Sequence, residues 1–87
     1  MKTIKDNAYN KDHTKQRLFE RYNILATDED YYELCELVFN RINATLIDIE
    51  IQSGGAQEIY NVLFKGCAVI AVWNPALQII KTVLPEV

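Results

Sequence analysis

The spacing of the apolar side chains changes once along this 87-residue chain, and that change limits what the chain can fold into. Before Asn43, apolar residues recur every three or four positions, as in amphipathic helices. After Asn43 they alternate with polar residues, as in strands that bury one face. The length and an ordinary composition, 49% hydrophobic and 24% charged, suit one domain. We therefore expect helices first and strands second within a single domain.

Two helices are predicted in the first half of the chain. Residues 1–10 are polar and lack a period, so we expect a flexible N-terminal arm there. The first helix is predicted to begin near Asp12 and to end at Asn23. Thr27 is the expected N-cap of the second helix, and three carboxylates follow it, where the helix dipole favours negative charge. The predicted buried stripe of this second helix is Tyr31, Leu34, Cys35, Val38 and Ile42.

Four strands are predicted in the second half, and turn residues separate them. The two-residue turn at Lys65-Gly66 would place Phe64 opposite Cys67 in an antiparallel pair. The predicted fold class is α+β, with two N-terminal helices followed by a four-stranded antiparallel β-meander. The expected strands are residues 45–52, 58–64, 67–73 and 78–84.

The predicted register gives the central hairpin two apolar faces. Two short helices can cover only one of them, so the other must curl around a core or meet another surface. We expect a homodimer if that second face stays flat. The first face carries Tyr60, Val62, Phe64, Cys67, Val69, Ala71 and Trp73. The second carries Ile59, Leu63, Ala68, Ile70 and Val72.

Charge is segregated along the chain although the formal net charge is only −3. Residues 1–22 hold six basic and three acidic side chains, whereas residues 23–50 hold seven acidic side chains and one arginine. Two solvated helix faces that partly neutralise one another would explain this pattern, and so would a charged partner.

Cofactors, metals and membranes are not expected for this chain. No apolar run is long enough to span a bilayer, and no apolar stretch follows the basic start, so we expect a cytoplasmic protein without membrane contact. Cys35 and Cys67 are predicted to be reduced residues of the core. One histidine and two separated cysteines do not make a zinc site.

The single histidine marks the candidate chemistry. His13, Arg17 and Arg21 follow one another at intervals of four, which places them on nearly one side of the first helix. Arginines hold phosphate oxygens, and their charge favours a neutral imidazole that can accept a proton. The histidine and the two arginines therefore suit binding and cleavage of a phosphodiester. A surface histidine on a basic helix face is the alternative interpretation.

The segment HTKQRLFERY, residues 13–22, resembles the opening helix of small phage and mobile-element domains. These toxin-like domains are similar to the barnase, EndoU, colicin D and RelE group of ribonucleases. The likeness extends over most of the predicted domain at residues 11–87. Three later segments of the chain resemble the three closing strands of those domains. They are EIYNV, KGCAVIAV and IKTVLP, at residues 58–62, 65–72 and 80–85.

The resemblance implies a metal-independent endoribonuclease that acts on host or phage RNA, free or ribosome-associated, and leaves a cyclic phosphate. It implies that His13 transfers the proton, that Arg17 and Arg21 bind phosphate, and that Thr82 offers a hydroxyl to it. The expected substrate-binding residues are Lys65, Trp73 and Tyr60, with an aromatic ring stacked on a base. Two alternatives stay open: a catalytically inert module of the same fold that binds a host or phage protein, and a structural oligomer subunit.

Overall fold

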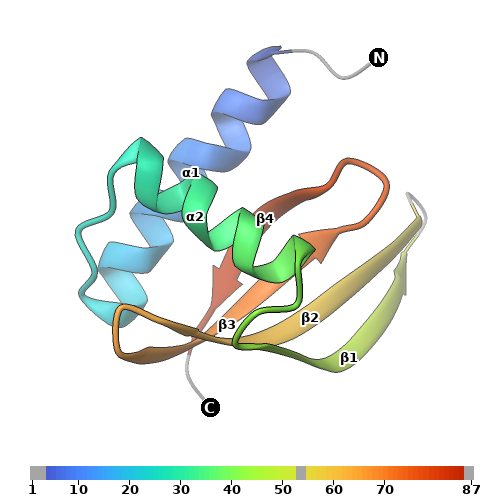
Figure 1. Cartoon of the computed structure of the whole chain (residues 1–87). Coiled ribbons are helices and arrows are strands. Elements are labelled where there is room, and N and C mark those ends of the chain that lie inside the picture. The colour runs from blue at the N-terminus through green and yellow to red at the C-terminus, as the bar shows by residue number, and fades with distance from the viewer. Residues whose placement is uncertain (1–3, 53–54, 86–87) are drawn as a thin grey trace.

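A computed structural model describes residues 4–52 and 55–85 and has two helices followed by one antiparallel sheet (Figure 1). The strands follow one another in the sheet in the order β1-β2-β3-β4. The predicted α+β class and β-meander are therefore confirmed. The elements are α1 (Ile4–Tyr22), α2 (Asp28–Phe39), β1 (Ala44–Gln52), β2 (Gly55–Phe64), β3 (Cys67–Asn74) and β4 (Ile79–Leu84).

Helix α1 begins earlier than expected. Its first residue is Ile4 rather than Asp12, so residues 4–10 of the expected arm belong to the helix. The prediction failed because those residues are mostly polar and lack the apolar period that marks a buried helix face. Helix α2 begins where predicted, at a reciprocal capping box in which Thr27 and Asp30 each bind the other's backbone N–H.

The β2–β3 turn sets the register of the sheet. Lys65 and Gly66 both have positive φ angles, 51° and 77°, as a two-residue hairpin turn requires. Phe64 is paired with Cys67, so the predicted register is confirmed. The connection expected between the strands at residues 45–52 and 58–64 lies partly outside the described residues, and β2 begins earlier than expected, at Gly55.

Both helices pack on the same face of the sheet, the face that carries Tyr60 and Trp73 (Figure 1). The Tyr60 side chain is fully buried and Trp73 is 4% exposed. Helix α1 packs mainly against β4. The core residues that the helices contribute are Leu18, Tyr31, Leu34 and Val38, and the sheet contributes Tyr60, Val62, Phe64, Val69, Ala71, Trp73, Ile80 and Val83.

The opposite face of the sheet is concave. Residues from all four strands line one hollow of about 260 Å³ on it. Irregular pairing between Leu46 and Asp48 and between Val72 and Trp73 is consistent with this curvature, because bulges bend strands. Ile59 on this face is buried within the single chain, whereas Leu63 stays 54% exposed. Curling therefore covers part of the second apolar face, and the homodimer stays a prediction.

Strand β1 is the most exposed apolar element. It lies at one edge of the sheet, and with β2 it extends past the helices (Figure 1). Side chains of Leu46, Ile47, Ile49 and Ile51 are between 42% and 80% exposed.

Some of the segregated charges form ion pairs with one another where the two helices meet. Lys11 and Lys15 of α1 both form ion pairs with Asp28 of α2, at 3.0 and 2.5 Å. The prediction that the two charged faces partly neutralise one another is thus confirmed for these residues. None of the helices in the described segments is long and apolar enough to cross a membrane.

Candidate functional site

The row of His13, Arg17 and Arg21 lies along one flank of α1. The buried row of this helix, Thr14 and Leu18, faces the core. Lys11 and Lys15 lie on the other flank, where they form ion pairs with Asp28 of α2. The predicted one-sided arrangement of the histidine and the two arginines follows from their spacing of four within a continuous helix. We call these three residues the basic row.

The imidazole of His13 is half-buried and held in place by a neighbour. Its ring stacks on the ring of Tyr9, one turn earlier, with a centroid distance of 5.7 Å and an interplanar angle of 13°. Burial, and then the positive charges of Arg17 and Arg21, lower the pKa of His13 below its ordinary value of 6.5. The imidazole is therefore neutral at neutral pH and able to accept a proton.

Each arginine of the basic row makes one contact within the described part of the chain. Arg17 Nη1 lies 2.6 Å from a carboxylate oxygen of Glu20. Arg21 Nη1 donates to the backbone carbonyl oxygen of Val83 in β4 at 2.5 Å. A guanidinium has five N–H donors, so these contacts leave donors for a phosphate on both side chains.

Arg21 and Thr82 meet at a single oxygen atom. The Thr82 hydroxyl lies 3.5 Å from the same Val83 carbonyl oxygen that Arg21 binds. The next residue of α1 strengthens the junction, because the Tyr22 hydroxyl donates to the Leu84 carbonyl and accepts from the Ile70 N–H. Two of the predicted site residues, 61 positions apart in the chain, are therefore brought together where the end of α1 joins β4.

The same end of β4 borders the hollow on the concave face. Thr82 and Leu84 line this hollow together with Val72 of β3. Besides the Thr82 hydroxyl, its polar groups are the carboxylate of Glu50 on β1, the amide of Gln57 on β2 and the ammonium of Lys81 on β4. Gln57 is only 3% exposed, and its Oε1 atom has no hydrogen-bond partner among the described residues. A buried acceptor without a partner is costly in a protein interior. Thr14 Oγ1 on the buried row of α1 is in the same state.

The three predicted substrate-binding residues do not join this site. Tyr60 and Trp73 lie in the core beneath the helices, and a base cannot stack on a ring that has no exposed face. Their proposed stacking role is therefore corrected: both are core aromatics, and the Tyr60 hydroxyl donates to Glu58. Lys65 is exposed in the β2–β3 turn but forms an ion pair with Asp30 at 3.0 Å.

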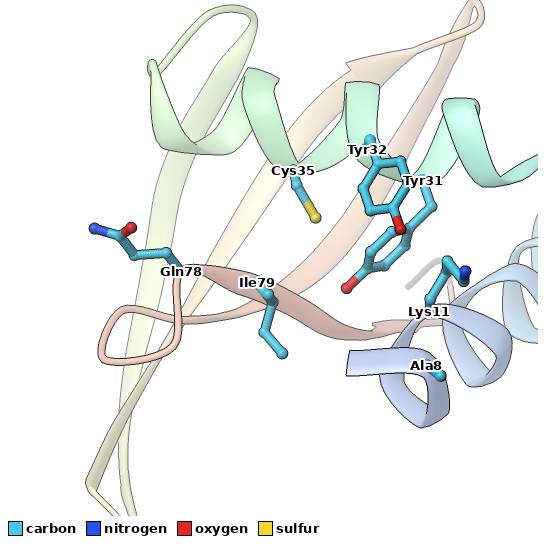
Figure 2. A pocket seen from close by; sticks show the side chains of 7 residues that line it. All are labelled: Ala8, Lys11, Tyr31, Tyr32, Cys35, Gln78 and Ile79. Carbon is cyan, nitrogen blue, oxygen red and sulfur yellow. The ribbon is translucent and has the colours of Figure 1, made fainter. Parts of the chain in front are cut away.

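A second cavity, of about 270 Å³, lies between the two helices and the start of β4 (Figure 2). The Tyr31 hydroxyl points towards β4 and donates to the Ile80 carbonyl oxygen. Burial raises the pKa of both Tyr31 and the Cys35 thiol, so neither ionises near neutral pH. Both cysteines are free, and both are half-buried residues packed against the core, whereas fully buried positions were predicted. Lys11 at the rim is already paired with Asp28, so the described lining of this cavity holds no free charged group for catalysis.

Glu50, Gln57 and Lys81 were missed by reasoning from the sequence. Glu50 and Gln57 are direct partners across β1 and β2, so their side chains lie on one face. Extending the register of the β2–β3 hairpin by one more pair would have placed Gln57 on that face. Nothing in the sequence locates Lys81 there, because the irregular pairing of β3 with β4 leaves Lys81 without a partner residue, between Ile80 and Thr82.

The fold and the site together define a small α+β protein with a basic helix flank at one end of a concave sheet. Comparison of the chain with protein families, with curated proteins and with solved structures finds no match. In the described residues no group of three or more His, Cys, Asp or Glu side chains is placed to hold a metal ion.

Proposed function

We propose that this protein is an endoribonuclease that needs no metal ion and acts on host or phage RNA. The observation that carries the proposal is the state of His13. It is the only histidine of the chain, and burial and two neighbouring arginines lower its pKa and favour the proton-accepting form. The junction of Arg21 with Thr82 supports the proposal, because it adds a cation and a hydroxyl at one place.

In the proposed reaction, the ribose 2′-hydroxyl attacks the adjacent phosphorus atom, and its proton passes to the His13 imidazole. The bond from phosphorus to the 5′-oxygen breaks, and that oxygen takes a proton from the imidazolium or from water. The products are a 2′,3′-cyclic phosphate and a 5′-hydroxyl. Arg17 and Arg21 stabilise the charge that develops on the phosphate oxygens.

The test is cleavage of free and ribosome-bound RNA, with and without EDTA. His13→Ala should reduce the rate by about 10²- to 10⁴-fold, the usual share of general acid–base catalysis. The control is Lys15→Ala, which removes a cation from the opposite flank of the same helix. Wild-type protein that leaves both RNAs intact would refute the proposal, as would a rate that EDTA abolishes.

Strand β1 favours a second candidate function, a module that binds another protein. An edge strand leaves backbone N–H and C=O groups open to pairing, and apolar side chains on it add contact area. The aliphatic side chains of Ile49 and Ile51 are 50% and 80% exposed, although burial is usual for isoleucine. Asp48 and Glu50 lie on either side of Ile49 in the chain and favour a basic partner strand.

The second function is tested by Ile49→Lys and Ile51→Lys. Each should abolish binding to a partner captured by the wild type while leaving the melting temperature nearly unchanged, because half or more of each residue is already exposed to solvent. Tyr32→Lys, at an exposed aromatic of α2 far from β1 in the chain, is the matched control. Equal binding by all variants would exclude β1 as the docking element.

A further inference from the structure

The register of the sheet shows which backbone groups lie along the outer edge of β1. Strand β1 is at one end of the sheet and pairs with β2 alone (Figure 1). The Leu63 N–H of β2 donates to the Asn43 carbonyl oxygen just before β1. Alternate residues of an antiparallel strand bond to the same neighbour, so Gln57, an even number of residues away, also faces β1. The backbone of Glu50, the partner of Gln57, therefore bonds to β2, whereas its two neighbours in the chain point to the free edge.

One backbone N–H on this edge is held by a side chain of the same strand. The Ile49 N–H donates to the carboxylate of Asp48 at 2.8 Å. Asp48 is the cross-strand partner of Ile59, and Glu50 is that of Gln57, so both carboxylates lie on the concave face of the sheet. Both acidic residues are exposed, and neither has an ion-pair partner among residues 4–52 and 55–85.

The other side of β1 is apolar and uncovered. Ile49 and Ile51 pair with Glu58 and Ala56, so they lie on the opposite face from the two carboxylates. This part of β1 extends past the helices (Figure 1), and the two isoleucines are 50% and 80% exposed. Acidic side chains and a bulge commonly protect an edge strand from unwanted pairing, but that protection does not require exposed isoleucines. The isoleucines therefore indicate an edge that receives a partner.

We propose that β1 receives an extended basic segment of another protein as a fifth strand of the sheet, and this inference rests on the proposed protein-binding function. A backbone carbonyl oxygen of the incoming strand takes the Ile49 N–H from Asp48. The released carboxylate then pairs with a basic side chain of that strand, and a second basic side chain lies beside Glu50. Side chains alternate between the faces of a strand, so the segment carries lysine or arginine at every second position. Apolar residues between them pack beside Ile49 and Ile51.

Charge disfavours a second copy of this chain at the same edge. Two β1 strands that pair antiparallel about Ile49 place Asp48 of each copy opposite Glu50 of the other. Pairing about Glu50 places the two Glu50 carboxylates opposite each other. Like charges directly opposite one another destabilise a sheet, whereas opposite charges stabilise it. A basic segment therefore fits this edge better than another β1 does.

The test uses synthetic seven-residue peptides with blocked ends that alternate valine with lysine, threonine or glutamate. Isothermal titration into the whole protein at low salt should rank the lysine peptide first and the glutamate peptide last. Asp48→Asn and Glu50→Gln should each reduce the preference for lysine over threonine by about two- to fivefold, the usual effect of one exposed ion pair. Glu33→Gln, at an exposed carboxylate of α2, is the matched control and should keep the full preference.

Asp48→Ala separates the hydrogen bond of Asp48 from its charge. An asparagine at this position can still accept from the Ile49 N–H, whereas an alanine leaves that N–H open. The Asp48→Ala protein should therefore bind the threonine peptide more tightly than the Asp48→Asn protein does. Equal binding by these two variants would refute the exchange of the Ile49 hydrogen bond.

Methylated peptides test whether the segment binds as a strand. One lysine peptide is methylated on its valine backbone nitrogens and another on its lysine backbone nitrogens. Alternate N–H groups of a strand point to the same edge, so one of these peptides should lose binding and the other should keep it. Equal effects of the two methylations would overturn the inference. The absence of saturable binding of the lysine peptide up to millimolar concentration would overturn it as well, as would equal binding of all three peptides.

Failure of this inference and failure of the protein-binding function can be told apart. A captured protein whose binding requires Ile49 and Ile51 but neither carboxylate would keep that function and refute the basic segment alone. Binding that survives both Ile49→Lys and Ile51→Lys would refute both. Dimers of the wild type that dissociate in Ile51→Lys would assign the edge to a second copy and overturn the inference.

Discussion

Arg21 donates a hydrogen bond to the backbone carbonyl oxygen of Val83, and this contact joins the end of α1 to the last strand across 62 positions. Arg21 therefore helps to hold α1 against the sheet. Arg17 does not, because it binds Glu20 of its own helix. We expect Arg21→Ala to lower the free energy of unfolding by about 1 kcal/mol, the usual contribution of one such bond. Urea unfolding followed by circular dichroism measures this loss.

Arg17→Ala provides the comparison for Arg21→Ala. An exposed ion pair three residues apart on one helix contributes only a few tenths of a kcal/mol, so Arg17→Ala should unfold nearly as wild type does. RNA cleavage should fall in both variants. Equal stability of the two variants would mean that the bond to Val83 adds nothing measurable to the fold.

The pKa of His13 can be measured without ambiguity, because the chain has a single imidazole. Its proton resonances in an NMR titration should give a value below 6.5. Burial is the largest cause of the lowered pKa, and Arg17 follows it, so Arg17→Gln should move the value upward. The acidic limb of a pH–rate profile should then move in the same direction, because cleavage requires the neutral imidazole.

Lys15→Gln is the control for this titration, since neither it nor its partner Asp28 is among the causes that shift the pKa of His13. A His13 pKa at or above 6.5 in the wild type would contradict the partly buried position of the ring. It would also remove the observation that carries the proposed function.

Local chemistry made the elements of the fold predictable. The Lys65-Gly66 turn determines which residues of β2 and β3 share a face, so the buried face around Tyr60 followed from the register. Thr27 followed by Asp30 three positions later marks the start of α2. These signals act over a few residues, and the sequence displays them directly.

Long-range geometry made most of the site unpredictable. The spacing of the basic row was readable because a helix repeats regularly, whereas the meeting of Arg21 with Val83 depends on how α1 packs on β4. The hollow depends on the curvature of all four strands, and the pairing irregularities that accompany the curvature leave no clear mark in the sequence. Gln57 therefore looked like an ordinary polar residue of the connection before the strand expected at residues 58–64, whereas β2 begins at Gly55.

Asp28 should make the stability of the protein depend on pH at the acidic end. Hydrogen bonds from Lys15 and then Lys11 lower the pKa of Asp28 below its ordinary value of 3.8. The folded state thus holds the ionised carboxylate more strongly than the unfolded state does. The stabilising effect is complete above 3.8 and is lost as the pH falls through the lower, folded-state pKa.

Asp28→Asn tests this dependence by thermal unfolding across the acidic range. The variant should melt below wild type at pH 7, and the two melting temperatures should converge once the pH lies well below 3.8, where the wild-type carboxylate is also neutral. Added salt should reduce the difference between the two melting temperatures at pH 7, because both ion pairs of Asp28 are open to solvent and screened.

Glu33→Gln is the control, at an exposed carboxylate of α2 with no ion pair among the described residues. It should show neither the pH dependence nor the salt dependence. A gap that persisted unchanged at low pH would mean that the substituted amide disturbs the start of α2 by itself, and that the contact between the two helices does not depend on the charge of Asp28.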